Sequence, residues 1–260
     1  MMPLLQINDL SVDYLSEGTA GRSFRAVDGI SFALERGEML AVVGESGSGK
    51  TTLALGIMRL LPENAKVTGS IILKGRDFNS MSEEEKDQIR WKEIAVVFQN
   101  SLEVLNPVMR MEDQICEPMI KHLHIEKDEA KKRGSELFRL VDLDPVWLKA
   151  YPHQLSGGMR QRALIAMALS CQPEILILDE VTSALDAFTK AKIADLLRRL
   201  QRDFGYSMIL ISHDISFLSS LTNRMMVMYA GRAMERGDTD KMIDHPLHPY
   251  TRGLINSTPG

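Results

Sequence analysis

Residues 44–51 read Gly-Glu-Ser-Gly-Ser-Gly-Lys-Thr, which fits the pattern G-x-x-x-x-G-K-[ST]. Glycines let the backbone turn tightly, so that successive N–H groups point at phosphate oxygens. An apolar run at Met39–Val43 precedes the stretch and a helix-like run follows it, so the positive end of a helix also faces the loop. Lys50 supplies a charge for the β- and γ-phosphates, and Thr51 offers a hydroxyl to Mg²⁺. The stretch, called the P-loop below, predicts a nucleotide site rather than a plain Gly/Ser surface loop.

A second motif supplies carboxylates. Four apolar residues at 175–178 end in Asp179 and Glu180. Carboxylates at the carboxyl edge of a parallel sheet lie where ligands bind in α/β folds. We expect Asp179 to hold Mg²⁺ and Glu180 to polarise an attacking water. Alone, the same pattern also fits a strand that runs into a solvated turn; together with the P-loop it indicates phosphate chemistry.

Composition sets the class of protein. The chain has 260 residues, of which 44% are apolar and 25% charged, so it can bury a core as one large or two small domains. The net charge of −4 disfavours a strongly basic nucleic-acid binder. Cys116 and Cys171 form no CxxC and are expected to be buried or half-buried thiols in a reducing compartment. No signal peptide and no membrane-length apolar run is present, so we expect a soluble, cytoplasmic chain whose membrane role comes through a partner.

The order of elements defines the expected fold. Strands are predicted at Leu4–Leu10, Ala26–Leu34, Met39–Val43, Val67–Leu73 and Ile94–Phe98, with helices at 50–61 and from Ser82 to Trp91. Helical spacing then continues, and we predict an inserted helical subdomain over about residues 101–168. Strands and helices alternate afterwards, at 175–178, 189–203, 207–211, 215–221 and 224–229. Alternation of this kind favours a mainly parallel sheet.

The fold class expected is therefore α/β: a P-loop NTPase core with a mainly parallel sheet, an N-terminal antiparallel β-subdomain and the inserted helices. A C-terminal tail, residues 238–260, is predicted as two short helices broken by Pro246 and Pro249. We treat residues 1–260 as one ATP-binding domain.

A third motif narrows the family. Residues 155–162 read Leu-Ser-Gly-Gly-Met-Arg-Gln-Arg, in which Ser156 and the following backbone can bind an anion at a helix N-terminus. By itself this is also an ordinary N-cap. The P-loop, this signature and the apolar-Asp-Glu strand, in that order, resemble the ATP-binding subunits of ABC (ATP-binding cassette) transporters. The resemblance covers residues 4–258.

The resemblance implies further site residues. Gln99 matches the Q-loop glutamine that contacts Mg²⁺ and the attacking water, Asp186 the key position of the D-loop, and His213 the switch histidine at the γ-phosphate. Each also has a structural alternative: a polar strand end for Gln99, an N-cap for Asp186, and a residue beside the Asp214 cap for His213. Tyr14 lies where the family stacks an aromatic ring on adenine, with Phe24 as a competitor.

The implied site has three parts. The catalytic residues are Glu180, His213 and Gln99, and the ligands of Mg²⁺ are Thr51, Gln99 and Asp179. The residues expected to contact ATP are Gly44, Glu45, Ser46, Gly47, Ser48, Gly49, Lys50, Thr51, Thr52, Tyr14, Ser156, Gly157, Gly158 and Asp186.

A finer resemblance points to the branch that imports dipeptides, oligopeptides and nickel. The stretches that carry it lie at 26–32, 105–107, 151–154, 228–231 and 248–254. The chain would then be a short, nickel-type member or a trimmed one. The chain departs from the family in two places: Val181 replaces the usual proline after the catalytic glutamate, and Asn-Ser at 100–101 replaces Asp-Pro. The first should loosen the following turn, because proline fixes φ.

The resemblance also implies partners. Two cassettes, identical or homologous, would close head-to-tail over ATP and Mg²⁺, on two transmembrane permease subunits at the cytoplasmic face of the membrane, with an extracytoplasmic solute-binding protein acting indirectly and no nucleic acid. The chain would hydrolyse ATP to power uptake of peptides, nickel or a related solute. The alternative is a soluble ABC ATPase of DNA repair or translation. Those usually carry a long insertion or two cassettes, whereas Gln99 and Ser156 are only 57 positions apart.

Overall fold

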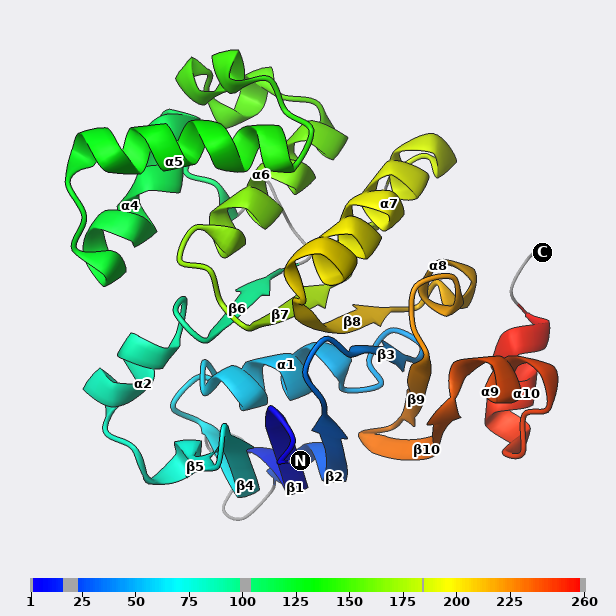
Figure 1. Cartoon of the computed structure of the whole chain (residues 1–260). Helices are drawn as coiled ribbons and strands as arrows, with labels where there is room; N and C mark the ends of the chain where they lie inside the picture. Colours follow the sequence, from blue (N-terminus) through cyan, green and yellow to red (C-terminus); the bar gives the residue numbers. More distant parts are fainter. Residues whose placement is uncertain (1, 16–22, 99–103, 184, 258–260) are drawn as a thin grey trace. The chain divides into compact units, whose positions relative to one another are not determined.

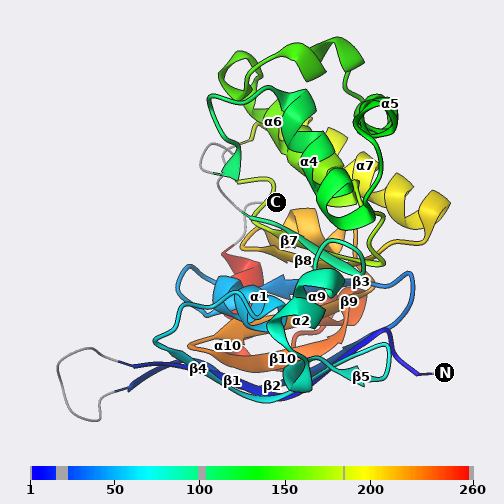
Figure 2. The same ribbon diagram turned by 90° about the vertical axis from the view of Figure 1, so that its left-hand side faces the viewer.

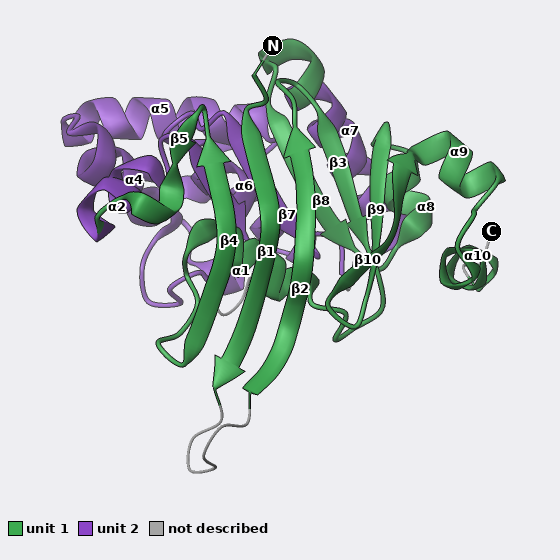
Figure 3. Ribbon diagram, turned by 90° about the horizontal axis from the view of Figure 1, so that it is seen from below, with its two compact units in different colours: residues 1–82, 201–260 green, residues 83–200 purple. Residues whose placement is uncertain are grey.

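The structure is a computed structural model that describes residues 2–15, 23–98, 104–183 and 185–257. Its contacts divide the chain into two compact units, each described here by itself. The first unit joins the N-terminal 82 residues to residues 201–260, and the second comprises Glu83–Leu200 (Figure 3). The predicted α/β class is confirmed.

The first unit contains the predicted antiparallel N-terminal sheet. Its strands are β1 (Leu5–Leu15), β2 (Ser23–Leu34), β4 (Ala65–Leu73) and β5 (Arg76–Asp77), in the order β2-β1-β4-β5. The three long strands lie side by side in Figure 3, and Figure 2 shows the same strands nearly edge-on. Ile7 stands opposite Phe32 on one neighbour and Ile71 on the other, and all three are buried.

Strand β1 is longer than the predicted strand at Leu4–Leu10. Its pairing with β2 shifts register between Ile7 and Asp13, and Asp9 has a φ of 52°. Such bulges interrupt the two-residue alternation on which a sequence-based strand prediction depends. The backbone pairing nevertheless continues to Leu15.

A second group of strands in the first unit has the order β10-β9-β3-β8. Strands β3 (Met39–Val43), β8 (Ser207–Ser212) and β9 (Arg224–Tyr229) run parallel, as expected from the alternating pattern. Strand β10 (Arg232–Asp238) runs antiparallel to β9 and was missed, because its mostly exposed residues carry charges and no alternation of apolar residues. The turn before it puts Ala230 and Gly231 at positive φ, as a tight hairpin turn requires.

Short helices complete this unit (Figure 1). They are α1 (Lys50–Met58), α8 (Ile215–Ser219), α9 (Thr239–Asp244) and α10 (Pro249–Asn256), with a 3₁₀ turn at Phe78–Ser80. Helix α1 ends before the predicted Leu61, because Arg59 takes a left-handed conformation with its N–H bonded back to the last turn. Pro249 occupies the first turn of α10, where proline is tolerated.

The second unit is mainly helical. Its helices are α2 (Glu83–Ile89), α4 (Met111–Leu123), α5 (Lys127–Leu140), α6 (Gly157–Leu169) and the start of α7 (Ala187–Phe204), with 3₁₀ turns at Pro145–Lys149 and Pro152–Gln154. Strands β6 (Ile94–Val97) and β7 (Ile175–Asp179) pair in parallel. Buried Ile115, Met119 and Phe138 lie on the apolar faces of α4 and α5. Among the described residues, no helix is long and apolar enough to cross a membrane.

Candidate functional site

The P-loop connects β3 to α1, as its motif predicts. Helix α1 begins at Lys50, directly after Gly49, whose φ is 99°. The side chain of Lys50 is only 6% exposed. Its Nζ donates to the carbonyl oxygens of Gly44 at 2.7 Å and Glu45 at 2.8 Å. The ammonium is therefore held at the base of the loop by backbone carbonyls, next to the N-terminus of α1.

Two P-loop glycines are required by close backbone packing. A Cβ on Gly44 would lie 2.3 Å from the carbonyl oxygen of Met228, and a Cβ on Gly49 would lie 2.4 Å from that of Ala26. Gly47 differs: its φ is 80°, and no described atom lies within 4 Å of the position a Cβ would take. One side of the loop thus rests on neighbouring backbone, whereas its middle opens outward, as a phosphate cradle must.

The turn between β9 and β10 supports the loop from behind. The N–H of Gly231 donates to the carbonyl of Ser48 at 3.0 Å, and the N–H of Asp28 donates to that of Gly231 at 2.9 Å. Arg232 adds an ion pair to the Asp28 carboxylate at 2.6 Å. This exposed pair and Arg25 hold the pKa of Asp28 below its usual range. The loop is therefore fixed by backbone from β2 and from the β9–β10 turn.

The carboxylate motif lies at the end of β7 in the second unit. Asp179 is fully buried and Glu180 is 7% exposed. Glu180 has a φ of 52°, a left-handed conformation that costs energy for a residue with a side chain. The N–H and hydroxyl of Ser183 both donate to the Glu180 carbonyl, at 3.0 and 2.8 Å. The turn after Glu180 is closed by these bonds, and Val181, at the position where the family usually has proline, is buried.

The signature motif lies at the N-terminus of α6. The Ser156 hydroxyl accepts the N–H of Met159 at 3.3 Å, so Ser156 is the N-cap. A Cβ on Gly158 would lie 2.5 Å from Cγ2 of Thr189, whereas one on Gly157 would meet nothing among the described atoms nearer than Leu185 at 3.7 Å. The absence of a side chain at Gly158 therefore allows α6 to pack against Thr189, in addition to any contact that Gly158 makes with an anion.

Asp186 accepts two hydrogen bonds from Thr189, one from its N–H at 2.9 Å and one from its hydroxyl at 2.7 Å. These bonds, the hydroxyl's first, lower the pKa of the exposed Asp186 carboxyl. The structural alternative expected for this residue, an N-cap at the start of α7, is confirmed. Thr189 therefore contacts both the D-loop position and the signature glycine.

The remaining predicted residues are placed as follows. His213 is exposed at the end of β8, next to Asp214, whose carboxylate caps α8 through the N–H of Phe217. Tyr14 stands directly opposite Phe24 in the β1–β2 pairing, so the two candidate adenine contacts are cross-strand neighbours. Gln99 lies outside the described residues. The first unit therefore contains the P-loop and the adjoining Thr52. The second unit contains Asp179, Glu180, the signature and Asp186.

Two side chains near these motifs were not predicted to matter. Tyr250 in α10 and Tyr229 at the end of β9 have ring centroids 4.6 Å apart, and the Tyr250 hydroxyl is buried. Tyr250 lies in the stretch 248–254, which carries part of the resemblance to the importer branch. Nothing in its local pattern connects it to the P-loop, which is far away in sequence.

His122 of α4 is only 9% exposed and stacks on Trp91, with ring centroids 6.1 Å apart. Burial lowers its pKa. Both cysteines are buried and free, as expected, and burial raises the pKa of Cys116 to about 11.

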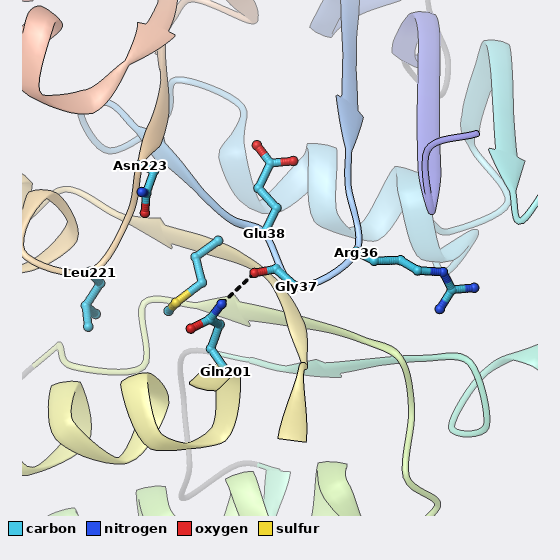
Figure 4. Close-up of a pocket in the computed structure, with 7 residues that line it drawn as sticks. Arg36, Gly37, Glu38, Gln201, Leu221 and Asn223 are labelled. Carbon is cyan, nitrogen blue, oxygen red and sulfur yellow. Dashed lines mark hydrogen bonds between the residues drawn. The ribbon is translucent and has the colours of Figure 1, made fainter. Parts of the chain in front are cut away.

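A polar cavity of about 300 Å³ lies near the amino end of β3, the end away from the P-loop. Gln201 lines it and donates to the carbonyl of Gly37 at 2.8 Å. In Figure 4 the side chains of Arg36 and Glu38 point away from one another, so its charged groups do not converge on a ligand.

The ABC transporter family matches residues 27–183 of this sequence, a segment that includes the P-loop, the signature and the carboxylate strand. The chain belongs to the ABC transporter family. The C-terminal region of the oligopeptide/dipeptide transporter family matches residues 234–260 of this cassette, which places it in that branch.

Individual proteins agree with this assignment. The oligopeptide transport ATP-binding protein OppD of Bacillus subtilis is 42% identical to this cassette over 260 residues, which cover 98% of this chain and 72% of the relative. The dipeptide transport ATP-binding protein DppD of Bacillus subtilis is 43% identical over 263 residues, covering 100% and 78%. A dimeric ATP-binding cassette solved in a post-hydrolysis state with ADP and Pi is 27% identical, with a TM-score of 0.80 over 90% of this chain and 98% of that one.

The expected family and branch are therefore confirmed, and this cassette is an ABC-type ATPase of a transport system rather than an ATPase of DNA repair or translation. The matches support peptide transport and do not specifically support nickel.

Proposed function

We propose that this cassette hydrolyses ATP to drive import of peptides through transmembrane partner subunits. The observation that carries the proposal is the buried Lys50 ammonium beneath an outward-open P-loop at the start of α1. A fixed cation, a helix N-terminus and exposed backbone at Ser46 and Gly47 suit a chain of phosphates. The relatives named for oligopeptide and dipeptide transport support peptides as the solute class.

The chain offers suitable donors for Mg²⁺. Thr51 is exposed in the first turn of α1, directly after Lys50, and Asp179 is a buried carboxylate at the end of a strand. Hydroxyl and carboxylate oxygens are the ligands that Mg²⁺ accepts at nucleotide sites. We assign these two residues, with Gln99, to the metal; once bound, it neutralises phosphate charge.

The proposed chemistry follows from the residues of each unit. Lys50 exchanges its carbonyl partners for β- and γ-phosphate oxygens, while the P-loop N–H groups from Ser46 to Thr52 bind the same phosphates. Glu180 accepts the proton of the attacking water, and His213 and Gln99 orient that water and the γ-phosphate. Tyr14 stacks on the adenine.

The proposal includes a second cassette, identical or homologous. In a head-to-tail pair, Ser156, Gly157 and Gly158 of one subunit face the P-loop of the other, and Asp186 lies beside them. Ser156 is exposed and caps α6, so its hydroxyl and the helix N-terminus can serve an anion from a facing subunit. A single donor of this kind is typically worth about 3 kcal/mol of the barrier.

Transport also requires the membrane partners. We propose that the cassette sits at the cytoplasmic face on two permease subunits, with an extracytoplasmic solute-binding protein upstream. The helical subdomain at about 101–168 then transmits closure to the permeases, and the tail at 238–260 completes the ATP-binding domain. Because ATP binds the closed pair better than the open one, it shifts the transporter between two states.

The decisive experiment compares two lysines of the first unit. Lys50→Ala should weaken ATP binding more than tenfold, because it removes the cation at the phosphates. Lys241→Ala changes an exposed lysine of α9 and should bind ATP like the wild type. ATP affinity of purified chain is measured by titration with a fluorescent nucleotide. Equal affinity of Lys50→Ala and the control would overturn the proposal.

The solute class is tested separately, by uptake into vesicles that contain the cassette and its permease subunits. ATP-dependent uptake of labelled di- and oligopeptides is expected. Uptake of Ni²⁺ without uptake of peptides would contradict the peptide assignment while leaving the ATPase assignment intact.

A further inference from the structure

Helix α10 of the C-terminal tail lies against the P-loop through one side chain. The ring of Tyr250 packs on that of Tyr229, with 4.6 Å between centroids and 46° between planes. Tyr229 follows Met228, whose carbonyl oxygen touches Gly44. The Tyr250 hydroxyl is buried next to the backbone N–H of Glu45, the second residue of the P-loop. All these residues belong to the first unit.

The position of Tyr250 is fixed by its own helix. Glu235 of β10 accepts the backbone N–H groups of Leu247 at 3.0 Å and His248 at 2.9 Å, which ties the start of α10 to the sheet. The ring of His248 then accepts the N–H of Tyr250 at 3.1 Å. Thr251, the next residue, is fully buried. The tyrosine is thus held from both its backbone and its ring.

The Gly44–Glu45 peptide connects Tyr250 to the catalytic cation. This trans peptide carries the Gly44 carbonyl, which accepts a hydrogen bond from Lys50 Nζ, and the Glu45 N–H, which faces Tyr250. In a trans peptide, C=O and N–H point in opposite directions. A group that holds the N–H therefore also sets the direction of the carbonyl on which Lys50 rests.

The hydroxyl of Tyr250 suits this task. Burial raises its pKa, an effect that the Glu45 N–H partly opposes, so the group stays a neutral phenol with an oxygen that can accept. Among the described residues, that oxygen has no hydrogen bond of full geometry. Leaving a buried hydroxyl unsatisfied is costly, and the neighbouring Glu45 N–H is the donor placed to satisfy it.

We propose that Tyr250 is a positioning residue for nucleotide binding, which fixes the Gly44–Glu45 peptide and through it the Lys50 ammonium. The proposal rests on the function proposed above, since it assumes that Lys50 binds phosphate. It assigns to the tail helix a role in the nucleotide site, although Tyr250 itself touches no phosphate.

The test removes one oxygen atom. Tyr250→Phe keeps the ring and its packing on Tyr229, and Tyr206→Phe removes another half-buried phenol of the same unit as a matched control. The Kd for ATP and the Tm without nucleotide are measured on the full chain. We expect Tyr250→Phe to raise the Kd about three- to tenfold, with a Tm within about 2 °C of the control.

Each outcome decides. A Kd within twofold of Tyr206→Phe overturns the proposal, as does a rise that appears only together with a clear fall in Tm, because that pattern means a purely structural role. Lys50→Ala is titrated alongside. If it binds ATP normally, the proposed function fails; if it binds weakly while Tyr250→Phe behaves as the control, only the role of Tyr250 is rejected.

Discussion

Asp186 and Thr189 are joined by two hydrogen bonds, of 2.9 and 2.7 Å, at the first turn of α7. Thr189 also fills the space beside Gly158, where a side chain would clash. One threonine therefore links the cap of α7 to the helix that carries the signature motif. A substitution of Asp186, Thr189 or Gly158 can therefore change helix stability, whether or not it also changes a contact with the nucleotide.

The capping role of Asp186 can be tested by comparing two substitutions. Asp186→Ala should lower the Tm by a few degrees, because the Thr189 N–H loses its acceptor, whereas Asp186→Ser keeps a capping oxygen and should lose less. Thermal unfolding checks both. The lowered pKa of Asp186 predicts that its stabilising effect is present near neutral pH and is lost as the pH falls below about 4, through the folded-state pKa. Equal Tm values for the two variants would contradict the capping role.

Glu180→Gln tests the proposed base. The amide cannot accept a proton, so ATP turnover should fall about 100-fold or more while ATP affinity stays near that of the wild type. Phosphate release is measured in the transporter assembled with its permease subunits. Turnover within a few-fold of the wild type would remove Glu180 from the mechanism.

The need for glycine in the P-loop can be tested at Gly49, with Gly253 of α10 as the control position. Gly49→Ala places a Cβ against the Ala26 carbonyl at a φ of 99°, so it should distort the loop and weaken ATP binding strongly. Gly253→Ala, within α10, meets no described atom within 4 Å and should raise stability by up to about 1 kcal/mol. Circular dichroism and ATP titration report both effects. A Gly49→Ala variant with normal ATP affinity would show that the backbone contact can relax.

Tyr14 and Phe24 are the two candidates for the proposed contact with adenine. They face each other across β1 and β2, but Tyr14 is half-buried and Phe24 is 68% exposed. Because its ring is held more firmly, we expect Tyr14 to stack on the adenine. Tyr14→Ala should weaken ATP binding about tenfold and Phe24→Ala by much less. The reverse order of Kd values would transfer the assignment to Phe24.

Cys116 should be nearly inert in the folded protein. With a pKa of about 11, raised by burial and then by Glu112 and Asp113, only about one thiol in a thousand is ionised at pH 8. The unfolded chain should alkylate about 100-fold faster, because its thiol has an ordinary pKa of 9.0. The raised pKa also predicts a pH dependence of the free energy of unfolding, because the folded state favours the protonated thiol. The contribution of Cys116 to stability is fully present below pH 9 and is lost as the pH rises through 11. Peptide mass mapping after iodoacetamide treatment, with and without urea, gives the two rates; similar rates would contradict the burial.

The elements that carry the P-loop and the carboxylate motif are predicted well from the sequence because they are local. A strand, a glycine-rich turn and a helix are contiguous at 39–58, so the Lys50 site follows from neighbouring residues alone. The apolar run before Asp179 likewise identifies β7.

Features that depend on distant contacts could not be predicted. The left-handed Glu180 is held by Ser183 and by buried packing that no pattern encodes. Strand β10 carries charges and exists because β9 offers it a partner. The burial of His122 likewise depends on tertiary packing, in which the ring of Trp91 stacks on it.

The support of the P-loop by the β9–β10 turn and by α10 has a consequence for biosynthesis. Gly44 and Ser48 leave the ribosome before the backbone they rest on, at Met228 and Gly231, has been made. A nascent chain that stops before this turn has the complete phosphate-binding sequence without the surface that shapes it. The loop can therefore take its supported shape only after the β9–β10 turn has been synthesised.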